Sequence, residues 1–235
     1  MAPHRVVITQ PTYLPWLGYF NQMACADTFI FLDSVQFEKS SWQQRNRLKG
    51  PNGDFWLTVP VLTKGRSRQL IKDVEITDER WTMKHFKTMK YLYAKAPFFR
   101  DVIDLFADIY QKRWEKLIDL NLAIIFMLAA KLGLSPRFHL SSELGGKGKK
   151  VDLLIQLCEK VGATHYMSGQ AAKAYIDQDN RFGNHGITLE YHDFPHPRYP
   201  QLHGPFVSHL SMVDAVMNVG WARTRELIDT IRDEI

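Results

Sequence analysis

Residues 5–33 read RVVITQPTYLPWLGYFNQMACADTFIFLD, and this stretch decides the fold class. The runs Arg5–Thr9 and Thr28–Leu32 are almost wholly apolar or β-branched, which is typical of strands covered on both faces. Two prolines end the first run, and residues 18–26 then have the apolar spacing of an amphipathic helix. A strand, a loop, a helix and a second buried strand form a right-handed crossover, so we expect the two strands to be adjacent and parallel.

An antiparallel ribbon and three helices are predicted next. Arg45–Leu48 and Phe55–Val61 flank Gly50-Pro51-Asn52-Gly53, whose Asn-Gly pair supplies the positive φ angles of a hairpin turn. From Asp78 the apolar period becomes helical, and it predicts helices at about 78–94, 97–109 and 114–132. We expect these helices, about residues 78–132, to form an inserted lobe.

The alternation of strands and helices returns in the second half of the chain. The pattern predicts strands at 138–140, 164–167 and 187–194 and helices at 150–161, 170–175, 211–219 and 221–235. The stretch 195–205 contains four prolines and is predicted to be irregular. We therefore predict a single α/β domain over residues 1–235. Its expected fold is a Rossmann-like three-layer arrangement with a parallel sheet, a β-ribbon insertion and the helical lobe.

The composition is that of an ordinary globular protein with a large core. Of 235 residues, 45% are hydrophobic, 23% charged and 12% aromatic, which excludes a disordered or collagen-like chain. Cys25 and Cys158 stand outside any metal-binding or disulfide spacing. The longest apolar stretch, residues 120–132, is shorter than the roughly 20 residues of a membrane span, and no targeting segment is visible. We expect a cytoplasmic protein without a membrane span.

Positive charge is concentrated in one part of the chain. The net charge is +5, yet residues 39–100 hold 14 basic and five acidic residues. A field of one sign can steer an anion, so phosphate-bearing small molecules, nucleic acid and acidic carrier proteins are candidate partners. No nucleic-acid-binding motif is present, so nucleic acid ranks last and we expect no nucleic-acid partner. The alternative is that most of these lysines form a solvated surface.

Four segments place polar and aromatic side chains where a parallel sheet binds ligands. Two follow the first two strands, one follows the strand at 164–167, and the fourth is the proline-rich stretch. In chain order, the candidate binding or catalytic residues are Gln10, Tyr13, Trp16, Tyr19, Asp33, Gln36, Lys39, Arg45, Asn46, Arg47, Ser168, Gly169, His196, Tyr199, Gln201 and His203. We expect six of them to line one cavity at the carboxyl ends of the strands: Gln10, Tyr13, Trp16, Asp33, Gln36 and Arg47.

Each segment also has a structural interpretation. The aromatic residues near Trp16 can belong to the core, Arg45 and Arg47 to a solvated edge, and Ser168 to a helix cap. Neither GxGxxG nor GxxxxGK[ST] occurs, so no dinucleotide fingerprint or P-loop is predicted. An Arg-x-Arg pair on a ribbon can nevertheless clamp a phosphate or carboxylate.

Four of the nine histidines fall in one short segment: His192, His196, His203 and His209. Imidazole titrates near neutral pH and serves as a general base or a metal ligand. The spacing differs from that of a zinc-protease helix and the prolines scatter the side chains, so no metal is expected. We expect a histidine of this loop, His203 ahead of His196, to reach the cavity; the alternative is an exposed surface loop.

The chain contains several motifs in a fixed order: Gln10-Pro-x-Tyr13-x-Pro15-Trp16-x-Gly18-Tyr19-Phe20, Ala26-Asp27, Leu32-Asp33-x-Val35-Gln36-Phe37, Arg45-Asn46-Arg47, Trp56-Leu57-Thr58-Val59-Pro60-Val61 and Tyr199-Pro200-Gln201. Nearly end to end, this chain resembles the WbqC-like protein family. The resemblance implies bacterial assembly of surface polysaccharide, related glycans or natural products. Many members have His where this chain has Thr9, which puts a catalytic role there in doubt.

A second resemblance concerns layout alone. The order of strand, loop, helix, Ala-Asp and strand is similar to that of pantothenate synthetases, which join an amine to a carboxylate. Trp16-Leu-Gly18-Tyr19 stands in place of their HxGH element, so ATP activation cannot be carried over.

The function that we expect is amide formation by a transferase. An acyl or aminoacyl group moves from a thioester or another activated donor to the amine of a sugar nucleotide or similar compound. His203 or His196 is the expected base and Asp33 the residue that orients the amine. Lys39, Arg45 and Arg47 are expected to bind the diphosphate or an acyl carrier's phosphopantetheine. The alternative is a non-catalytic binding or scaffold subunit of a glycan-assembly complex, with Trp16, Trp42 and Trp56 as contact residues.

Overall fold

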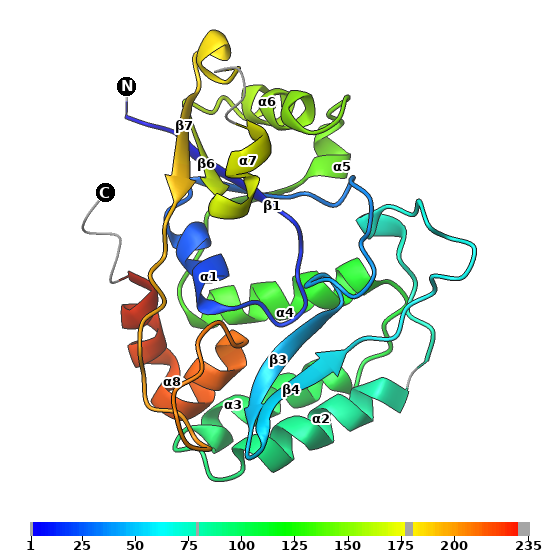
Figure 1. Ribbon diagram of the computed structural model, residues 1–235, viewed down its shortest axis with the longest axis vertical. Helices are drawn as coiled ribbons and strands as arrows, with labels where there is room; N and C mark the ends of the chain where they lie inside the picture. The colour runs from blue at the N-terminus through cyan, green and yellow to red at the C-terminus, as the bar shows by residue number, and fades with distance from the viewer. Residues whose placement is uncertain (1, 79, 177–180, 230–235) are drawn as a thin grey trace.

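The computed structural model describes residues 2–78, 80–176 and 181–229 (Figure 1). Its centre is a sheet of five parallel strands in the order β5-β2-β1-β6-β7. The strands are β1 (Arg5–Thr9), β2 (Thr28–Phe31), β5 (Arg137–Leu140), β6 (His165–Gly169) and β7 (Thr188–His192). β1 pairs with β2 from Val6 opposite Thr28 to Thr9 opposite Phe31, which confirms the expected adjacency and direction of the first two strands.

Helices cover both faces of this sheet. α1 (Leu17–Ala24), α4 (Leu117–Lys131) and α8 (Met212–Asp229) share a core with Val7, whereas α6 (Val151–Lys160) packs with Val6 and Ile8 on the other face. Successive residues of a strand point to opposite faces, so a strand buried on both must be apolar throughout. The predicted Rossmann-like three-layer α/β fold is confirmed.

The predicted ribbon is present as β3 (Arg45–Gly50) and β4 (Gly53–Thr58). Gly53 takes a φ of 109° at the turn, as the Asn-Gly signal requires. The predicted extension of the second strand to Val61 is wrong. β4 ends at Thr58, and beyond Pro60, which has no N–H to donate, Val61 pairs with Ile76.

Of the three consecutive helices, two stand with the ribbon and one lies against the sheet. α2 (Arg80–Tyr93) and α3 (Phe99–Tyr110) contact each other below the ribbon, whereas α4 runs between the ribbon and the sheet (Figure 1). Phe126 of α4 packs edge-on against Phe31 of β2, with ring centroids 5.6 Å apart. The helical layer and the sheet therefore share one continuous core.

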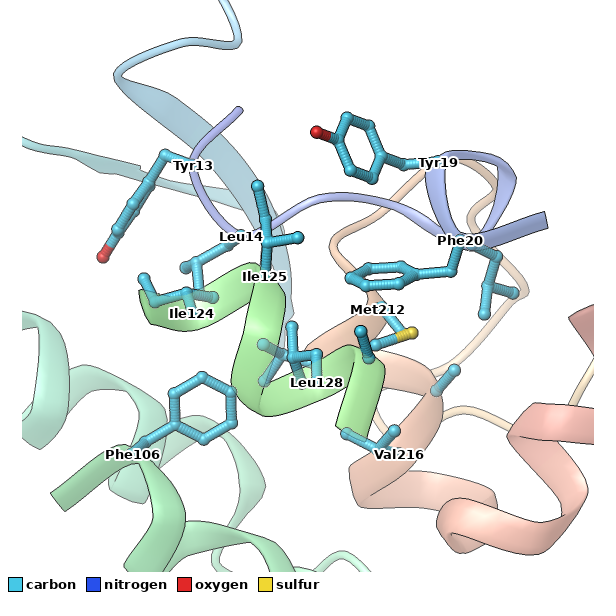
Figure 2. Close-up of a cluster of buried hydrophobic side chains, with 14 of the residues drawn as sticks. Tyr13, Leu14, Tyr19, Phe20, Phe106, Ile124, Ile125, Leu128, Met212 and Val216 are labelled. Atoms are coloured by element: carbon cyan, nitrogen blue, oxygen red, sulfur yellow. The ribbon is translucent and has the colours of Figure 1, made fainter. Parts of the chain in front are cut away.

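That core is shown in Figure 2, where α1, α3, α4 and α8 meet. Phe20 and Leu128 are wholly buried at its centre, with Phe106 on one side and Met212 on the other. The two predicted closing helices meet at Gly220, whose φ of 75° breaks α8; the predicted segment 230–235 lies outside the described residues. A side chain at Gly220 would meet the ring of Phe98 at 2.7 Å.

Short elements complete the chain. They are α5 (Ser141–Leu144), α7 (Lys173–Ile176) and three 3-10 turns, η1 (Ile71–Asp73), η2 (Gln170–Ala172) and η3 (Gly183–His185). The helix predicted at 170–175 is split between η2 and α7. None of the helices in the described ranges combines the length and apolarity needed to cross a bilayer.

Candidate functional site

A cavity of about 1080 Å³ opens at the carboxyl ends of β1 and β2, and we call it the strand-end cavity. The chain runs from β1 to β2 and β5 on one side, then returns to β6 and β7 on the other, and α/β proteins bind ligands at the edge where this reversal occurs. Its polar lining consists of Gln10, Ser34, Gln36, Glu38, Ser67, Arg68, Lys149 and Lys150.

Two of the predicted site residues, Gln10 and Gln36, lie in this cavity and fix its walls. Gln43 donates a hydrogen bond of 2.8 Å to the side-chain oxygen of Gln10. Gln36 donates one of 2.9 Å from its side chain to the carbonyl of Ser67. These bonds join the loop after β2 both to the loop after β1 and to residues 67–70, so three chain segments converge on one space.

The cavity carries positive charge at the start of α6. Among its lining residues are three basic side chains, Arg68, Lys149 and Lys150, and one acidic side chain, Glu38. Lys150 is the N-cap of α6 and makes no side-chain cap hydrogen bond there. The amino end of a helix and nearby basic side chains both favour an anion, so this wall suits a phosphate.

The sequence interpretation missed this wall, although a signal for it exists. Residues 145–150 read GGKGKK and stand directly before the predicted helix. Glycine is needed where the backbone turns with positive φ, as at Gly148 with a φ of 101°. Lys150 has a φ of 52° and a ψ of −125°, a strained conformation for a residue with a side chain. A glycine-rich, lysine-rich run before a helix is itself a phosphate-binding pattern.

Asp33, the residue predicted to orient an amine, is buried beside the cavity and points elsewhere. Its carboxylate accepts hydrogen bonds from the hydroxyl and the backbone N–H of Ser142 and from the hydroxyl of Ser141, the last at 2.8 Å. It therefore fixes the end of β2 to the start of α5. Its carboxylate is fully engaged with the protein, and Asp33 is absent from the cavity lining.

Tyr13 and Tyr19 are core residues rather than lining residues. The wholly buried hydroxyl of Tyr13 hydrogen-bonds to Nδ1 of His85, at 2.8 Å, and to the hydroxyl of Tyr110. Burial raises the pKa of both Tyr13 and Tyr19 well above the ordinary tyrosine value. Asn46 fixes the loop that carries Tyr13, because its side-chain amide donates a hydrogen bond of 2.8 Å to the carbonyl of Leu14.

Trp16 lies apart from the strand-end cavity, in a cluster with two histidines of the proline-rich loop. Its indole stacks on His209 and His196, with ring centroids 5.0 and 6.0 Å away. Burial, followed by the charge of His209, lowers the pKa of His196 to about 4. Nδ1 of His196 pairs with the carbonyl of Pro197, and Nε2 is buried without a partner among the described residues. His196 is therefore neutral at physiological pH.

The rest of the proline-rich loop is bound to α2 and α8. Nε2 of His203 pairs with the carbonyl of Leu92 at the end of α2, so the structure does not bring His203 to the strand-end cavity. The hydroxyl of Tyr199 donates to buried Asp214, and burial raises the pKa of that carboxyl to about 6. The side chain of Gln201 forms hydrogen bonds with both backbone groups of Val207.

Two of the three predicted phosphate-binding cations, Arg45 and Arg47, lie on the ribbon. The Arg45 guanidinium sits 4.4 Å from the ring centre of Trp56, which stacks on Trp42. Arg47 pairs with Asp54, and Lys39 is exposed on the loop before the ribbon. Arg45 and Arg47 lie over the ring of Trp56, and together with Trp42 they form a second polar and aromatic surface that shares no lining residue with the strand-end cavity.

The end of β6 holds the remaining predicted pair. Ser168 is buried and its hydroxyl donates to the carbonyl of Gly169 at 3.4 Å. Nearby, His192 hydrogen-bonds to Asn21, and burial lowers its pKa to about 4. Neither Ser168 nor Gly169 is part of the strand-end cavity lining. Within residues 2–78, 80–176 and 181–229, no group of three His, Cys, Asp or Glu side chains is arranged to hold a metal.

Comparison with known proteins gives two matches. The WbqC-like protein family matches residues 10–226. A relative from Mycobacterium tuberculosis (strain ATCC 25618 / H37Rv), described as "Uncharacterized protein Rv1507c", is 35% identical over 218 residues, which cover 92% of this chain and 94% of the relative. No solved structure matches.

Proposed function

The chain belongs to the WbqC-like protein family, and from that premise we propose that it is a cytoplasmic transferase of bacterial glycan assembly, including O-antigen and other surface polysaccharides. The reaction that we propose is amide formation. The amine of a sugar nucleotide or similar phosphate-bearing compound attacks the acyl or aminoacyl carbonyl of a thioester, held on coenzyme A or an acyl carrier. The thiolate leaves, and the proton of the attacking amine passes to the protein.

The strand-end cavity is the observation that carries this proposal. Its volume of about 1080 Å³ slightly exceeds the roughly 300–1,000 Å³ that is usual for small-molecule sites, and it accommodates a nucleotide-linked sugar. Arg68, Lys149 and Lys150 supply charge for a diphosphate next to the amino end of α6. The polar groups of Gln10 and Gln36 lie beside them and suit hydroxyl groups of a sugar.

Glu38 is the proton acceptor in this proposal. Acyl transfer from a thioester to an amine requires that the ammonium be deprotonated before attack. Among the residues that the structure describes, Glu38 is the one carboxylate that lines the cavity, and no histidine lines it. The role that the sequence interpretation gives to His203 therefore passes to Glu38.

Ligand binding tests the cavity directly. Thermal shift is measured with nucleoside diphosphate sugars that carry an amine, with coenzyme A, and with ATP. A ligand at 100 times its Kd stabilises the folded state by about 2.7 kcal/mol. We expect a sugar nucleotide to raise the Tm, and Arg68→Ala/Lys149→Ala to remove the rise. The matched control, Lys131→Ala/Lys160→Ala, removes two exposed lysines elsewhere and keeps it. Equal responses of both variants refute this site.

Catalysis is tested by mass spectrometry of an incubation of amino-sugar nucleotide and acyl thioester. We expect an amide product with one free thiol released per amide. Glu38→Gln is expected to lower the rate by about 10²- to 10⁴-fold while the Tm shift with sugar nucleotide persists. An unchanged rate excludes Glu38 as the base.

One observation favours the non-catalytic alternative. Trp42 and Trp56 are 48% and 42% exposed and stack with ring centroids 5.5 Å apart, an arrangement that suits contact with a sugar ring or a partner protein. If the protein is only a binding subunit, Trp42→Ala/Trp56→Ala abolishes glycan or partner binding, and no thioester donor yields an amide.

A further inference from the structure

A second cavity, of about 650 Å³, lies between the tip of the ribbon and α2, and we call it the ribbon–α2 groove. Phe55 of β4 forms one wall, and Met83, Lys84, Lys87 and Tyr91 of α2 form the other. It shares no lining residue with the strand-end cavity, so its role is independent of that site.

The groove exposes apolar side chains that a surface helix normally buries or lacks. Phe55 is 41% exposed, Met83 56% and Tyr91 75%. Met83 and Tyr91 are eight residues apart on α2, about 12 Å along the axis, and so lie on one outer stripe. The opposite stripe of α2, with Trp81, His85 and Met89, is buried in the core. Large apolar side chains gathered in an exposed hollow mark interaction sites.

The rim of the groove is positively charged. Within its bounds, α2 carries Arg80, Lys84, Lys87 and Lys90 and no acidic residue. Arg80 is paired with Asp78, whereas Lys84 and Lys87 make no ion pair with any residue that the structure describes. Asp54, the acidic residue among the described residues that line the groove, is paired with Arg47. The charge left over is therefore that of the lysines.

We infer that the ribbon–α2 groove binds an acidic amphipathic helix of a partner protein. Such a helix places apolar residues spaced by three, four and seven positions into a groove, and its carboxylates meet cations at the rim. The apolar wall residues Phe55, Met83 and Tyr91 and the cations Lys84 and Lys87 supply both parts. The site is concave, which suits a helix better than it suits the flat surface of a bilayer.

The experiment uses two fluorescent synthetic helices of equal length with the same leucine positions, one with Glu and one with Lys on the polar face. Binding to the full chain is measured by fluorescence anisotropy at low and physiological salt. Binding to vesicles of anionic phospholipid is measured in parallel by co-sedimentation. The variants are Lys84→Glu/Lys87→Glu, Met83→Ala/Tyr91→Ala, and the matched charge control Lys131→Glu/Lys160→Glu, at exposed positions on α4 and α6.

We expect the Glu helix to bind at least tenfold more tightly than the Lys helix and to weaken as salt rises. Lys84→Glu/Lys87→Glu is expected to reverse the preference, Met83→Ala/Tyr91→Ala to weaken binding about tenfold, and the control to leave binding within threefold of the parent. The inference is overturned if the Glu helix does not saturate the protein at millimolar concentration, or if the control variant loses as much affinity for the Glu helix as the groove variants do. It is also overturned if neither helix binds and the protein binds vesicles in a manner that Lys84→Glu/Lys87→Glu abolishes. Circular dichroism establishes that each variant is folded.

Discussion

Gly18 and Trp16 are predicted to be strongly coupled, because the indole occupies the space that a side chain at residue 18 needs. A Cβ built on Gly18 meets three indole atoms at 2.2, 2.3 and 2.7 Å. Ordinary van der Waals contact begins near 3.4 Å, so the overlap reaches about 1 Å and helix backbone cannot yield by that much. Gly18→Ala must therefore drive the indole out of its stack with His196 and His209.

The magnitude follows from what each change removes. Overpacking of this kind costs about 1–3 kcal/mol of unfolding free energy, so Gly18→Ala alone destabilises by that amount. In a Trp16→Ala background the space is empty, and the same change gains about 0.5–1 kcal/mol because alanine is the better helix former in α1. The two effects of Gly18→Ala thus differ by about 1.5–4 kcal/mol and have opposite signs.

The assay is urea unfolding of the parent, both single variants and the double variant, which together form a double-mutant cycle. His196 supplies a second readout, because release of the indole exposes its ring and raises its pKa from about 4 towards the ordinary histidine value. That pKa is followed by NMR of the imidazole protons. A cost of Gly18→Ala that is equal in both backgrounds refutes the reasoning, whatever its size.

Three further predictions concern residues of the core and the cavity. The pKa of buried His85 is lowered to about 4, mainly by burial, so between pH 6.5 and 4 the unfolded state binds a proton that the folded state does not. Stability therefore falls by up to about 3 kcal/mol as the pH is lowered from 6.5 to 4. In His85→Gln, the slope of the unfolding free energy against pH, measured by urea unfolding, should be smaller by about one proton over this window. Asp33→Asn weakens the bonds to Ser141 and Ser142 and should cost about 2–4 kcal/mol of stability; sugar-nucleotide affinity that falls more than tenfold in a variant still folded contradicts our structural role for Asp33. Lys150→Gly relieves the positive φ and should raise stability by about 1 kcal/mol, measured by urea unfolding. It should also weaken sugar-nucleotide binding about tenfold, measured by isothermal titration calorimetry, and unchanged or tighter binding contradicts the phosphate role of Lys150.

The sheet could be predicted because its signal is local. Val6–Ile8 and Phe29–Phe31 are apolar without interruption, and the chain between the two strands is long enough for only one crossover helix. The Asn-Gly turn of the ribbon is local for the same reason. Each of these elements is decided by residues within about 30 positions of one another.

The hydrogen-bond partners of polar loop residues could not be predicted, because these partners are far away in sequence. Asp33 pairs with Ser141 and Ser142, more than 100 residues later, and Tyr13 pairs with His85 and Tyr110. Nothing near Asp33 or Tyr13 in the sequence distinguishes a carboxylate or hydroxyl that faces solvent from one that binds another loop. The glycine-rich and lysine-rich run at 145–150 is different, since its signal was local and a search for anion-binding loops before helices finds it.

The order of strands in the sheet has a consequence for how the chain folds. β1 and β2 pair across about 22 residues, but β2 meets β5 across 109 residues (Thr28 opposite Arg137) and β1 meets β6 across 160 (Arg5 opposite His165). Closing a loop costs conformational entropy that grows with its length, so the parallel β1–α1–β2 unit and the local helices α2 to α4 should form first. The strand-end cavity needs α6 as well as the ends of β1 and β2, and we expect it to take shape only in a late phase of refolding, after the intervening chain has brought β5 beside β2. A ligand of that cavity should accordingly slow unfolding and leave the rate of the early folding phase unchanged.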